Sequence, residues 1–341
     1  MKYVSSLKSW QYILACTILL ISGITAVRAQ MPAGPDRPAK VPEGYLITPM
    51  GYFHESCVLE LAEGDVMHPD EKAIQHKDGS FDSMPACAYP RFTPDGEKVG
   101  DDGKIPEKEG LALADADDET VPPASIGHEW VEALYLLGDS SFAKLSAAWT
   151  VPPEPKAHDN QVIFFFPGLE DYTVGRKTTI LQPVLGWNAN PKFKNSWSLA
   201  SWNCCFDGIS VYSTPIATAA GHQNFGAMQY TCPAGTRKCG SWHIVSTDVT
   251  TGENTILPST SSNGFSFNWA FPGVLEVYKV KQCSDYPDGS AGSTKFSEIR
   301  LLDYNFNVVD PHWVLWKLWP GLTPKCGYAA SGTGSEVTLK Y

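Results

Sequence analysis

The stretch Thr179-Ile-Leu-Gln-Pro-Val-Leu-Gly-Trp187 decides the fold class, because it is short, apolar and rich in branched and aromatic residues. Gly273-Val-Leu-Glu-Val-Tyr-Lys-Val280 has the same character. Further runs of this kind are Leu145–Val151, Gln161–Phe166, Gly208–Tyr212, Gly226–Thr231, Trp242–Asp248 and Phe296–Leu302. No amphipathic helix pattern separates these runs. The sequence therefore predicts an all-β fold, an antiparallel two-sheet sandwich rather than a parallel α/β sheet.

The composition agrees with a globular β protein. Of 341 residues, 43% are hydrophobic and 18% are charged, and the chain holds 11 Trp, 14 Tyr and 15 Phe. Disorder would require fewer apolar residues and more charge. The formal net charge of −11 argues against a nucleic acid or an anionic membrane as partner.

Residues 1–29 have the features of a secretory signal peptide. Lys2 and Lys8 precede an apolar run over residues 12–27, and Val27 and Ala29 match the small residues before a cleavage site. The run is shorter than the roughly 20 residues of a membrane-spanning helix, although an uncleaved anchor is the alternative. Cleavage removes three basic residues and no acidic ones, which changes the net charge from −11 to −14. We expect a secreted, extracellular protein.

The cysteines support export. Cys16 leaves with the signal peptide, and eight remain: Cys57, Cys87, Cys204, Cys205, Cys232, Cys239, Cys283 and Cys326. An even number in an exported chain predicts disulfides, of which Cys57–Cys87 and Cys232–Cys239 are the expected local pairs. Zinc is the alternative, but adjacent cysteines and the lack of CxxC spacing disfavour it. We expect no metal and no cofactor.

The mature chain divides into three parts. Residues 30–93 form a small N-terminal module with short β-like runs, which could be a prosegment. Residues 94–125 are polar and acidic, as in a linker, with a solvated surface loop as the alternative. Residues 126–341 contain the sandwich strands.

Most common catalytic motifs are absent, but two strands carry a polar residue on an apolar face. The chain has no G-x-S-x-G, Walker A or HExxH sequence. Alternation places Gln182 on the face of Ile180 and Val184, and Glu276 on the face of Tyr278. A carboxylate can deprotonate water while an amide N–H stabilises the resulting oxyanion, so the two could form a hydrolytic pair. The alternative is that both face solvent.

Five segments resemble the glutamic peptidases known as eqolisins, over roughly residues 140–305. They are Ser146–Pro152, Thr179–Gln182, Trp197–Trp202, Gly273–Val280 and Phe296–Leu302. The resemblance implies a concanavalin A-like sandwich with catalytic Gln182 and Glu276 in a concave groove. It also implies that Trp149, Trp197, Trp202 and Tyr278 contact the substrate. The neprosin-type glutamic peptidases are more distantly similar and have an N-terminal prosegment, which residues 30–125 could imitate.

Two functions of different class follow from these observations. The first is a secreted hydrolase, an acid-active endopeptidase made as a zymogen, which cleaves polypeptides with Gln182 and Glu276. The second is a noncatalytic lectin-like sandwich that binds polysaccharide through groove aromatics. A weaker third possibility is a glycosidase, in which Glu170 or Asp171 would supply the second acid.

Overall fold

The computed structural model describes residues 37–68, 72–84, 86–100, 130–171, 179–205, 208–264, 266–288, 292–316 and 324–341. The predicted signal peptide and most of the acidic linker lie outside the described residues. No helix in the described ranges has the length and apolar character needed to cross a membrane.

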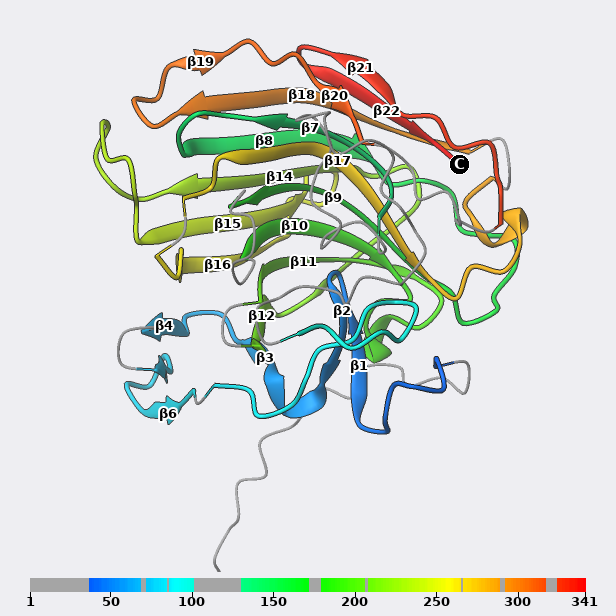
Figure 1. Cartoon of the computed structure of the whole chain (residues 1–341), viewed down its shortest axis with the longest axis horizontal. Coiled ribbons are helices and arrows are strands. Elements are labelled where there is room, and N and C mark those ends of the chain that lie inside the picture. Colours follow the sequence, from blue (N-terminus) through cyan, green and yellow to red (C-terminus); the bar gives the residue numbers. More distant parts are fainter. Residues whose placement is uncertain are drawn as a thin grey trace, which may run out of the picture.

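Two large β-sheets packed face to face confirm the predicted all-β sandwich (Figure 1). The nine-stranded sheet has the order β20-β7-β17-β9-β10-β11-β12-β3, with β13 also paired to β11. Its strands are β20 (Val314–Leu315), β7 (Trp130–Leu137), β17 (Trp269–Tyr278), β9 (Val162–Glu170), β10 (Ile180–Trp187), β11 (Trp197–Cys204), β12 (Ser210–Ser213), β3 (Val58–Leu61) and β13 (Ile216–Thr218). Its pairs are antiparallel except β12 with β3, which is parallel.

The eight-stranded sheet has the order β16-β15-β14-β8-β18-β22-β21, with β19 also paired to β18. Its strands are β16 (Asn254–Ser261), β15 (Ser241–Asp248), β14 (Gln223–Tyr230), β8 (Phe142–Thr150), β18 (Ser293–Asp303), β22 (Glu336–Lys340), β21 (Ser331–Thr333) and β19 (Val308–Val309). All of its pairs are antiparallel. Such hairpin-rich pairing follows from strands that are linked without intervening helices.

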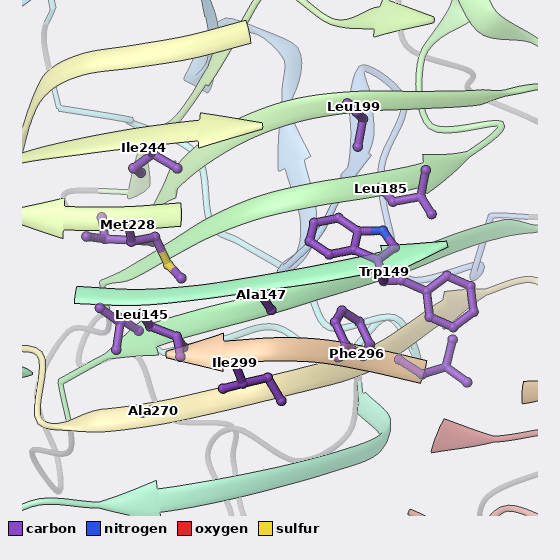
Figure 2. Packing of buried hydrophobic residues seen from close by; sticks show 14 of the residues in the cluster. Leu145, Ala147, Trp149, Leu185, Leu199, Met228, Ile244, Ala270, Phe296 and Ile299 are labelled. Atoms are coloured by element: carbon purple, nitrogen blue, oxygen red, sulfur yellow. The ribbon is translucent and has the colours of Figure 1, made fainter. Parts of the chain in front are cut away.

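The main hydrophobic core lies between the two sheets. Leu185 and Leu199 from the nine-stranded sheet meet Leu145 and Trp149 from the eight-stranded sheet, and each is at most 1% exposed (Figure 2). Because side chains alternate along a strand, every second residue of β10 enters this core. The residues between them point to the opposite face of the nine-stranded sheet, which we call the outer face.

Buried hydroxyl groups also connect the two sheets. The Ser201 hydroxyl donates to the carbonyl oxygen of Thr255 at 3.1 Å and lies 3.0 Å from the Ser246 hydroxyl. Asn203 Nδ2 donates to Thr260 Oγ1 at 2.8 Å. Since each of these polar atoms has a partner, they fix the register of the sheets without a large desolvation penalty.

Pro183 lies in the middle of the nine-stranded sheet, in β10 between β9 and β11. Proline lacks the backbone N–H of a ladder, so the sequence predicts an edge or a bulge there. The register agrees with an irregularity: β10 pairs with β9 at Leu181 and again at Leu185, with no pairs between. The strand is central rather than at an edge because its other side pairs with β11 without interruption.

The N-terminal module packs against part of the outer face and lies at the β12 end of the nine-stranded sheet (Figure 1). It contains the hairpin β1 (Tyr45–Thr48) and β2 (Gly51–His54), the 3-10 turn η1 (Glu55–Cys57), and a small sheet of β4 (Val66–His68), β5 (Ala73–Gln75) and β6 (Phe81–Ser83). Tyr45 and Phe53 of the hairpin belong to one buried cluster with Phe164, Trp202 and Trp269 of the outer face. The strand β3 extends the large sheet by pairing with β12.

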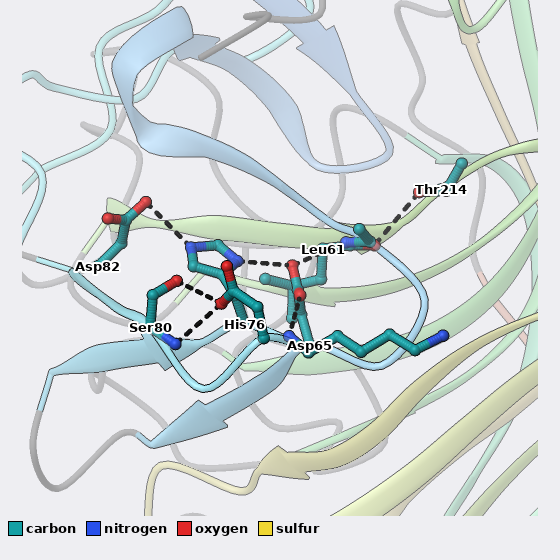
Figure 3. Close-up of polar contacts among 9 residues, drawn as sticks. Leu61, Asp65, His76, Ser80, Asp82 and Thr214 are labelled. Atoms are coloured by element: carbon teal, nitrogen blue, oxygen red, sulfur yellow. Dashed lines mark hydrogen bonds and ion pairs between the residues drawn. The ribbon is translucent and has the colours of Figure 1, made fainter. Parts of the chain in front are cut away.

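His76 lies between two carboxylates of the N-terminal module and links them (Figure 3). His76 Nδ1 lies 3.2 Å from Asp65, and its Nε2 lies 3.1 Å from Asp82. The hydrogen bond to Asp82 raises the pKa of His76 above its ordinary value. The stabilisation of the module by a charged His76 imidazole is therefore present in mild acid, and it is lost as the pH rises through the raised pKa.

Four disulfides are present in the described chain, and both expected local pairs are confirmed. They are Cys57–Cys87, Cys204–Cys205, Cys232–Cys239 and Cys283–Cys326. The first lies within the N-terminal module and the other three lie within the sandwich. None of them joins the module to the sandwich, so noncovalent contacts and the intervening chain hold the two together.

Candidate active site

Gln182 and Glu276 both lie on the outer face, and both side chains are 0% exposed. Gln182 alternates with Ile180 and Val184, which pack beneath the N-terminal module. Glu276 shares its face with Val274 and Tyr278. The predicted alternation is therefore correct, and the module covers this face instead of solvent.

The strand β9 separates the two polar residues. Glu276 pairs with Phe164 of β9, and Phe164 pairs with Gly186 of β10, which lies four residues beyond Gln182. On its other side, Gln182 pairs with Trp202 of β11. By this register Gln182 and Glu276 are on one face, but they are about four residues, or about 13 Å, apart along the sheet and two strands apart across it.

A single turn of the N-terminal module contacts both sites. This turn, Thr48–Gly51, joins β1 to β2. Gln182 Nε2 donates to the carbonyl oxygen of Pro49 at 3.3 Å. The Tyr278 hydroxyl lies 2.7 Å from Glu276 Oε1 and 2.8 Å from the carbonyl oxygen of Thr48, and it accepts from the backbone N–H of Gly51 at 2.6 Å. The turn therefore lies against Gln182 and Tyr278, and Tyr278 in turn contacts Glu276.

The single hydroxyl proton of Tyr278 limits which of these contacts it can donate to at one time. A tyrosine hydroxyl has one proton, so Tyr278 cannot donate to both the Thr48 carbonyl and an ionised Glu276. If the Glu276 carboxyl carries a proton, it donates to Tyr278, and Tyr278 donates to Thr48.

Glu170 is a third polar residue of the outer face. It pairs with Ile180 of β10 and with Trp269 of β17, both on the outer face, and it is 0% exposed. Gln182 occupies the diagonal position from Glu170, where Cα atoms of neighbouring strands are about 7–8 Å apart. By register, Glu170 is nearer to Gln182 than Glu276 is.

The same register argues against the glycosidase. Six residues separate Glu170 from Phe164, the partner of Glu276. At about 3.3 Å per residue, the two carboxylates are about 20 Å apart along the sheet. Glycosidases need about 5–9.5 Å between their two acids. Asp171 instead accepts a hydrogen bond from the Ser266 backbone N–H at 2.8 Å.

The predicted aromatic residues divide between the two faces. Trp149 and Trp197 are each 1% exposed and lie in the core between the sheets, so the structure does not bring them to the outer face. Alternation explains this, because residues 197, 199 and 201 of β11 point inward. Trp202 and Tyr278 do lie on the outer face. Trp202 stacks on Tyr212 with ring centroids 4.5 Å apart.

The lectin-like alternative lacks an aromatic platform. The large hydrophobic residues that the described chain exposes are Phe81, Tyr89, Leu137, Val249, Val308, Val314 and Leu315. They do not gather at Trp202, which is 3% exposed beside the module. Stacking on a sugar requires an accessible aromatic face, and the two predicted platform residues Trp197 and Trp202 are at most 3% exposed.

Glu132 is a buried carboxyl that the sequence analysis did not single out. It lies in β7, is 1% exposed, and has the tyrosines Tyr286, Tyr328 and Tyr341 near it. Burial raises its pKa to about 8, although the backbone N–H groups of Lys340 and Ala329 act in the opposite direction. In the sequence, Glu132 could have been noticed because it is a charged residue inside the apolar run Trp130–Leu137.

No group of three His, Cys, Asp or Glu side chains within the described ranges is arranged to hold a metal ion. The arrangement on the outer face offers carboxyl, amide and phenol groups. These groups can transfer protons and stabilise an oxyanion.

No protein-family model and no curated protein matches the sequence. Several solved structures are similar. Scytalido-glutamic peptidase with a transition state analog inhibitor has 17% identity and a TM-score of 0.45, covering 63% of this chain and 98% of that one. SCP-B, a member of the eqolisin family in a complex with the tripeptide Ala-Ile-His, has 16% identity, a TM-score of 0.44 and the same coverage. Aspergilloglutamic peptidase from Aspergillus niger has 14% identity and a TM-score of 0.31, covering 53% and 98%.

Proposed function

We propose that the protein is a secreted endopeptidase of the glutamic type that cleaves polypeptides in acid, with Gln182 and Glu276 as its catalytic residues. One observation carries this proposal. Gln182 Nε2 donates to a backbone carbonyl oxygen, that of Pro49, on a largely apolar face. A donor that stabilises the oxyanion of peptide hydrolysis must make this kind of contact with the substrate carbonyl.

The chemistry needs a base, an oxyanion donor and one water. The Glu276 carboxylate takes a proton from the water as its oxygen attacks the carbonyl carbon of the peptide bond. Gln182 Nε2 donates to the oxygen that becomes negative. The protonated Glu276 then gives its proton to the leaving nitrogen, so the C–N bond breaks and an acid and an amine result. Tyr278, at 2.7 Å, orients Glu276.

Glu170 is the second candidate for the base. Its diagonal position beside Gln182 favours it by register, whereas the contact with Tyr278 and the shared turn favour Glu276. Both are carboxylates of the same buried face, so the reaction class is the same with either residue.

Two features support activity in acid. The mature chain is expected to carry a charge of −14, and protonation of carboxylates relieves its self-repulsion. Glu132 is buried with a pKa raised to about 8, so its contribution to stability is most favourable in acid.

The N-terminal module would make the protein a zymogen. Its turn Thr48–Gly51 occupies the space above Gln182 and Tyr278, which excludes a substrate. Its disulfide, Cys57–Cys87, is internal. Cleavage of the chain between the module and the sandwich would therefore leave no covalent link, and the module could dissociate.

Digestion of denatured casein tests the proposal. The full-length secreted protein is incubated across pH 2–7, and mass spectrometry records loss of the N-terminal module. We expect cleavage limited to acid, abolished by Glu276→Gln. Glu253→Gln, at an exposed position, is the matched control and should retain activity. Loss of activity in Glu170→Gln with retention in Glu276→Gln would transfer the base to Glu170. Full activity in both variants would contradict the mechanism.

A further inference from the structure

A buried carboxyl that the proposed reaction does not use lies near the edge of the nine-stranded sheet opposite to β3. This is Glu132 of β7, which is 1% exposed. Glu132 pairs directly with Leu275 of β17, and Leu275 belongs to the core between the two sheets, so the Glu132 side chain enters that core. Acidic residues are rarely buried this fully unless they are paired, so the surroundings of Glu132 decide what it can do.

The Glu132 carboxyl has no hydrogen-bond partner on either oxygen among the described residues. The backbone N–H groups of Ala329 and Lys340 lie near it, but each donates to the carbonyl oxygen of the other at 3.2 Å. An ionised carboxylate here would give up its hydration and gain no hydrogen bond in return. Burial therefore raises the pKa of Glu132 to about 8, and the carboxyl stays neutral in acid.

Three tyrosines near Glu132 have hydroxyl groups that are bonded elsewhere. The Tyr328 hydroxyl donates to a backbone carbonyl oxygen at 2.8 Å. Its oxygen also lies 3.0 Å from the Tyr286 hydroxyl, which must be the donor because Tyr328 has only one proton. The Tyr341 hydroxyl lies 3.0 Å from Thr294 Oγ1. These contacts hold the tyrosines around Glu132 without stabilising a charge on it.

The other ionisable groups of this region do not compensate a charge on Glu132. Asp285 Oδ2 accepts from a backbone N–H at 2.8 Å, and a carboxylate has no proton to donate. Lys325 and Lys340 are both exposed. Lys340 follows the buried Leu339 in β22, so alternation directs its ammonium group to solvent.

Most of the groups around Glu132 belong to one segment, residues 324–341, which we call the C-terminal arm. It contains β21 and β22 at the end of the eight-stranded sheet, and β22 joins the rest of that sheet through β18. The arm can therefore detach as a local opening that leaves the other strand pairs intact. The disulfide Cys283–Cys326 links the arm to the turn η6 (Cys283–Asp285), so a detached arm stays close and can dock again.

We propose that Glu132 is a proton-dependent latch for the C-terminal arm. While its carboxyl is protonated, the arm stays docked over it. An ionised carboxylate reaches water only when the arm moves away, so the arm opens locally as the pH rises while the rest of the sandwich stays folded. The latch is closed in acid, where the proposed peptidase works, but it does not depend on that activity.

Hydrogen exchange of the full-length secreted protein at pH 5, 6 and 7 tests the latch. Mass spectrometry measures each rate, which is then divided by the intrinsic chemical rate at that pH. The corrected exchange of the β22 amides should rise by at least tenfold from pH 5 to pH 7, and by at most about tenfold per pH unit. Glu132→Gln cannot ionise and should abolish this rise. Glu298→Gln, at an exposed position of β18, is the matched control and should retain it.

Dilute urea separates local opening from unfolding of the whole chain. Local opening exposes little surface, so exchange of β22 at pH 7 should hardly depend on urea, whereas exchange of the central strand β9 should increase with it. If Glu132→Gln does not fold, Glu132→Met removes the ionisable group at similar volume and should also abolish the rise. Equal urea dependence of β22 and β9 would overturn the latch, because the arm would then open only with the whole chain. A rise that persists in both variants would also overturn it. Absence of peptidase activity would leave the result unchanged.

Discussion

The two faces of the nine-stranded sheet differ in how they are covered. The inner face packs against the eight-stranded sheet through residues such as Leu185, and the polar bridge at Ser201 reinforces that contact. The outer face packs against the N-terminal module, and it carries Gln182 and Glu276 among its apolar residues. The same strands supply both faces by alternation. The difference teaches that one cover is part of the sandwich itself, whereas the other is a separate module that no disulfide joins to it.

The largest effect on stability is expected from substitutions at two adjacent residues of β10 that face opposite sides of the sheet. Leu185 lies in the inner core and Val184 lies under the module. Leu185→Ala should lower the free energy of unfolding by about 2–5 kcal/mol, because it leaves a cavity between the sheets. This cost should be the same in the full chain and in the processed form. Val184→Ala should lower the free energy of unfolding by less, and only in the form that still has the module. Urea unfolding of both forms measures this, and equal costs for Val184→Ala in both forms would contradict a removable cover.

Gln182, the proposed oxyanion donor, should affect the rate of cleavage rather than the stability of the fold. Gln182→Ala should lower the rate of peptide cleavage by about 10²–10³, because it removes a donor to the developing negative charge. Unfolding in urea should change little, since the lost contact is the hydrogen bond to Pro49. Steady-state kinetics with a fluorogenic peptide measure the rate. A loss below tenfold with a normal fold would show that Gln182 is not the donor.

The buried carboxyl of Glu132 should make the stability of the fold depend on pH. Its pKa is raised to about 8 in the fold, against about 4.5 for an ordinary glutamate. Below the lower value both states are protonated and stability is complete. As the pH rises from there towards 8, only the unfolded state ionises, and stability falls by at most about 1.4 kcal/mol per pH unit.

Glu132→Gln should remove most of this decline, which amounts to about 3 kcal/mol by pH 7. Urea unfolding of the wild type and the variant at pH 4 and pH 7 measures the difference. Glu63→Gln, at an exposed position of the module, is the control. An unchanged difference between the two pH values would place the pH dependence elsewhere.

The smallest effect is expected where the module meets the edge of the large sheet. Glu60 accepts from the Tyr212 hydroxyl at 3.2 Å and lies 3.8 Å from the Lys192 ammonium group, which is largely exposed. Glu60→Gln should weaken the docking of β3 by at most about 1 kcal/mol, as is typical of exposed ion pairs. Hydrogen exchange of the β3 amides should then rise by no more than about fivefold. A much larger rise would make this contact a main attachment of the module.

The sequence was sufficient for the fold class because alternation and turn residues are local signals. Gln182 and Glu276 were found because each interrupts an apolar face, and the structure places both on one face. Alternation along one strand already puts Trp197 and Trp202 on opposite faces, but the sequence could not show which of the two lies on the outer face. It also could not show that Glu170 lies diagonally beside Gln182, because strand pairing is a tertiary property. The contact of the turn Thr48–Gly51 with residues more than a hundred positions away depends on the same packing.

The parallel pairing of β3 with β12 has a consequence for solubility. In the full chain, β3 satisfies the backbone N–H and C=O groups of Ser210–Ser213 at one end of the large sheet. Removal of the module would leave β12 as an open edge of the large sheet, next to apolar residues of the outer face that the module no longer covers. Open edges recruit strands from other chains and promote aggregation. The N-terminal module therefore also covers a sheet edge that would otherwise be open to pairing with another chain.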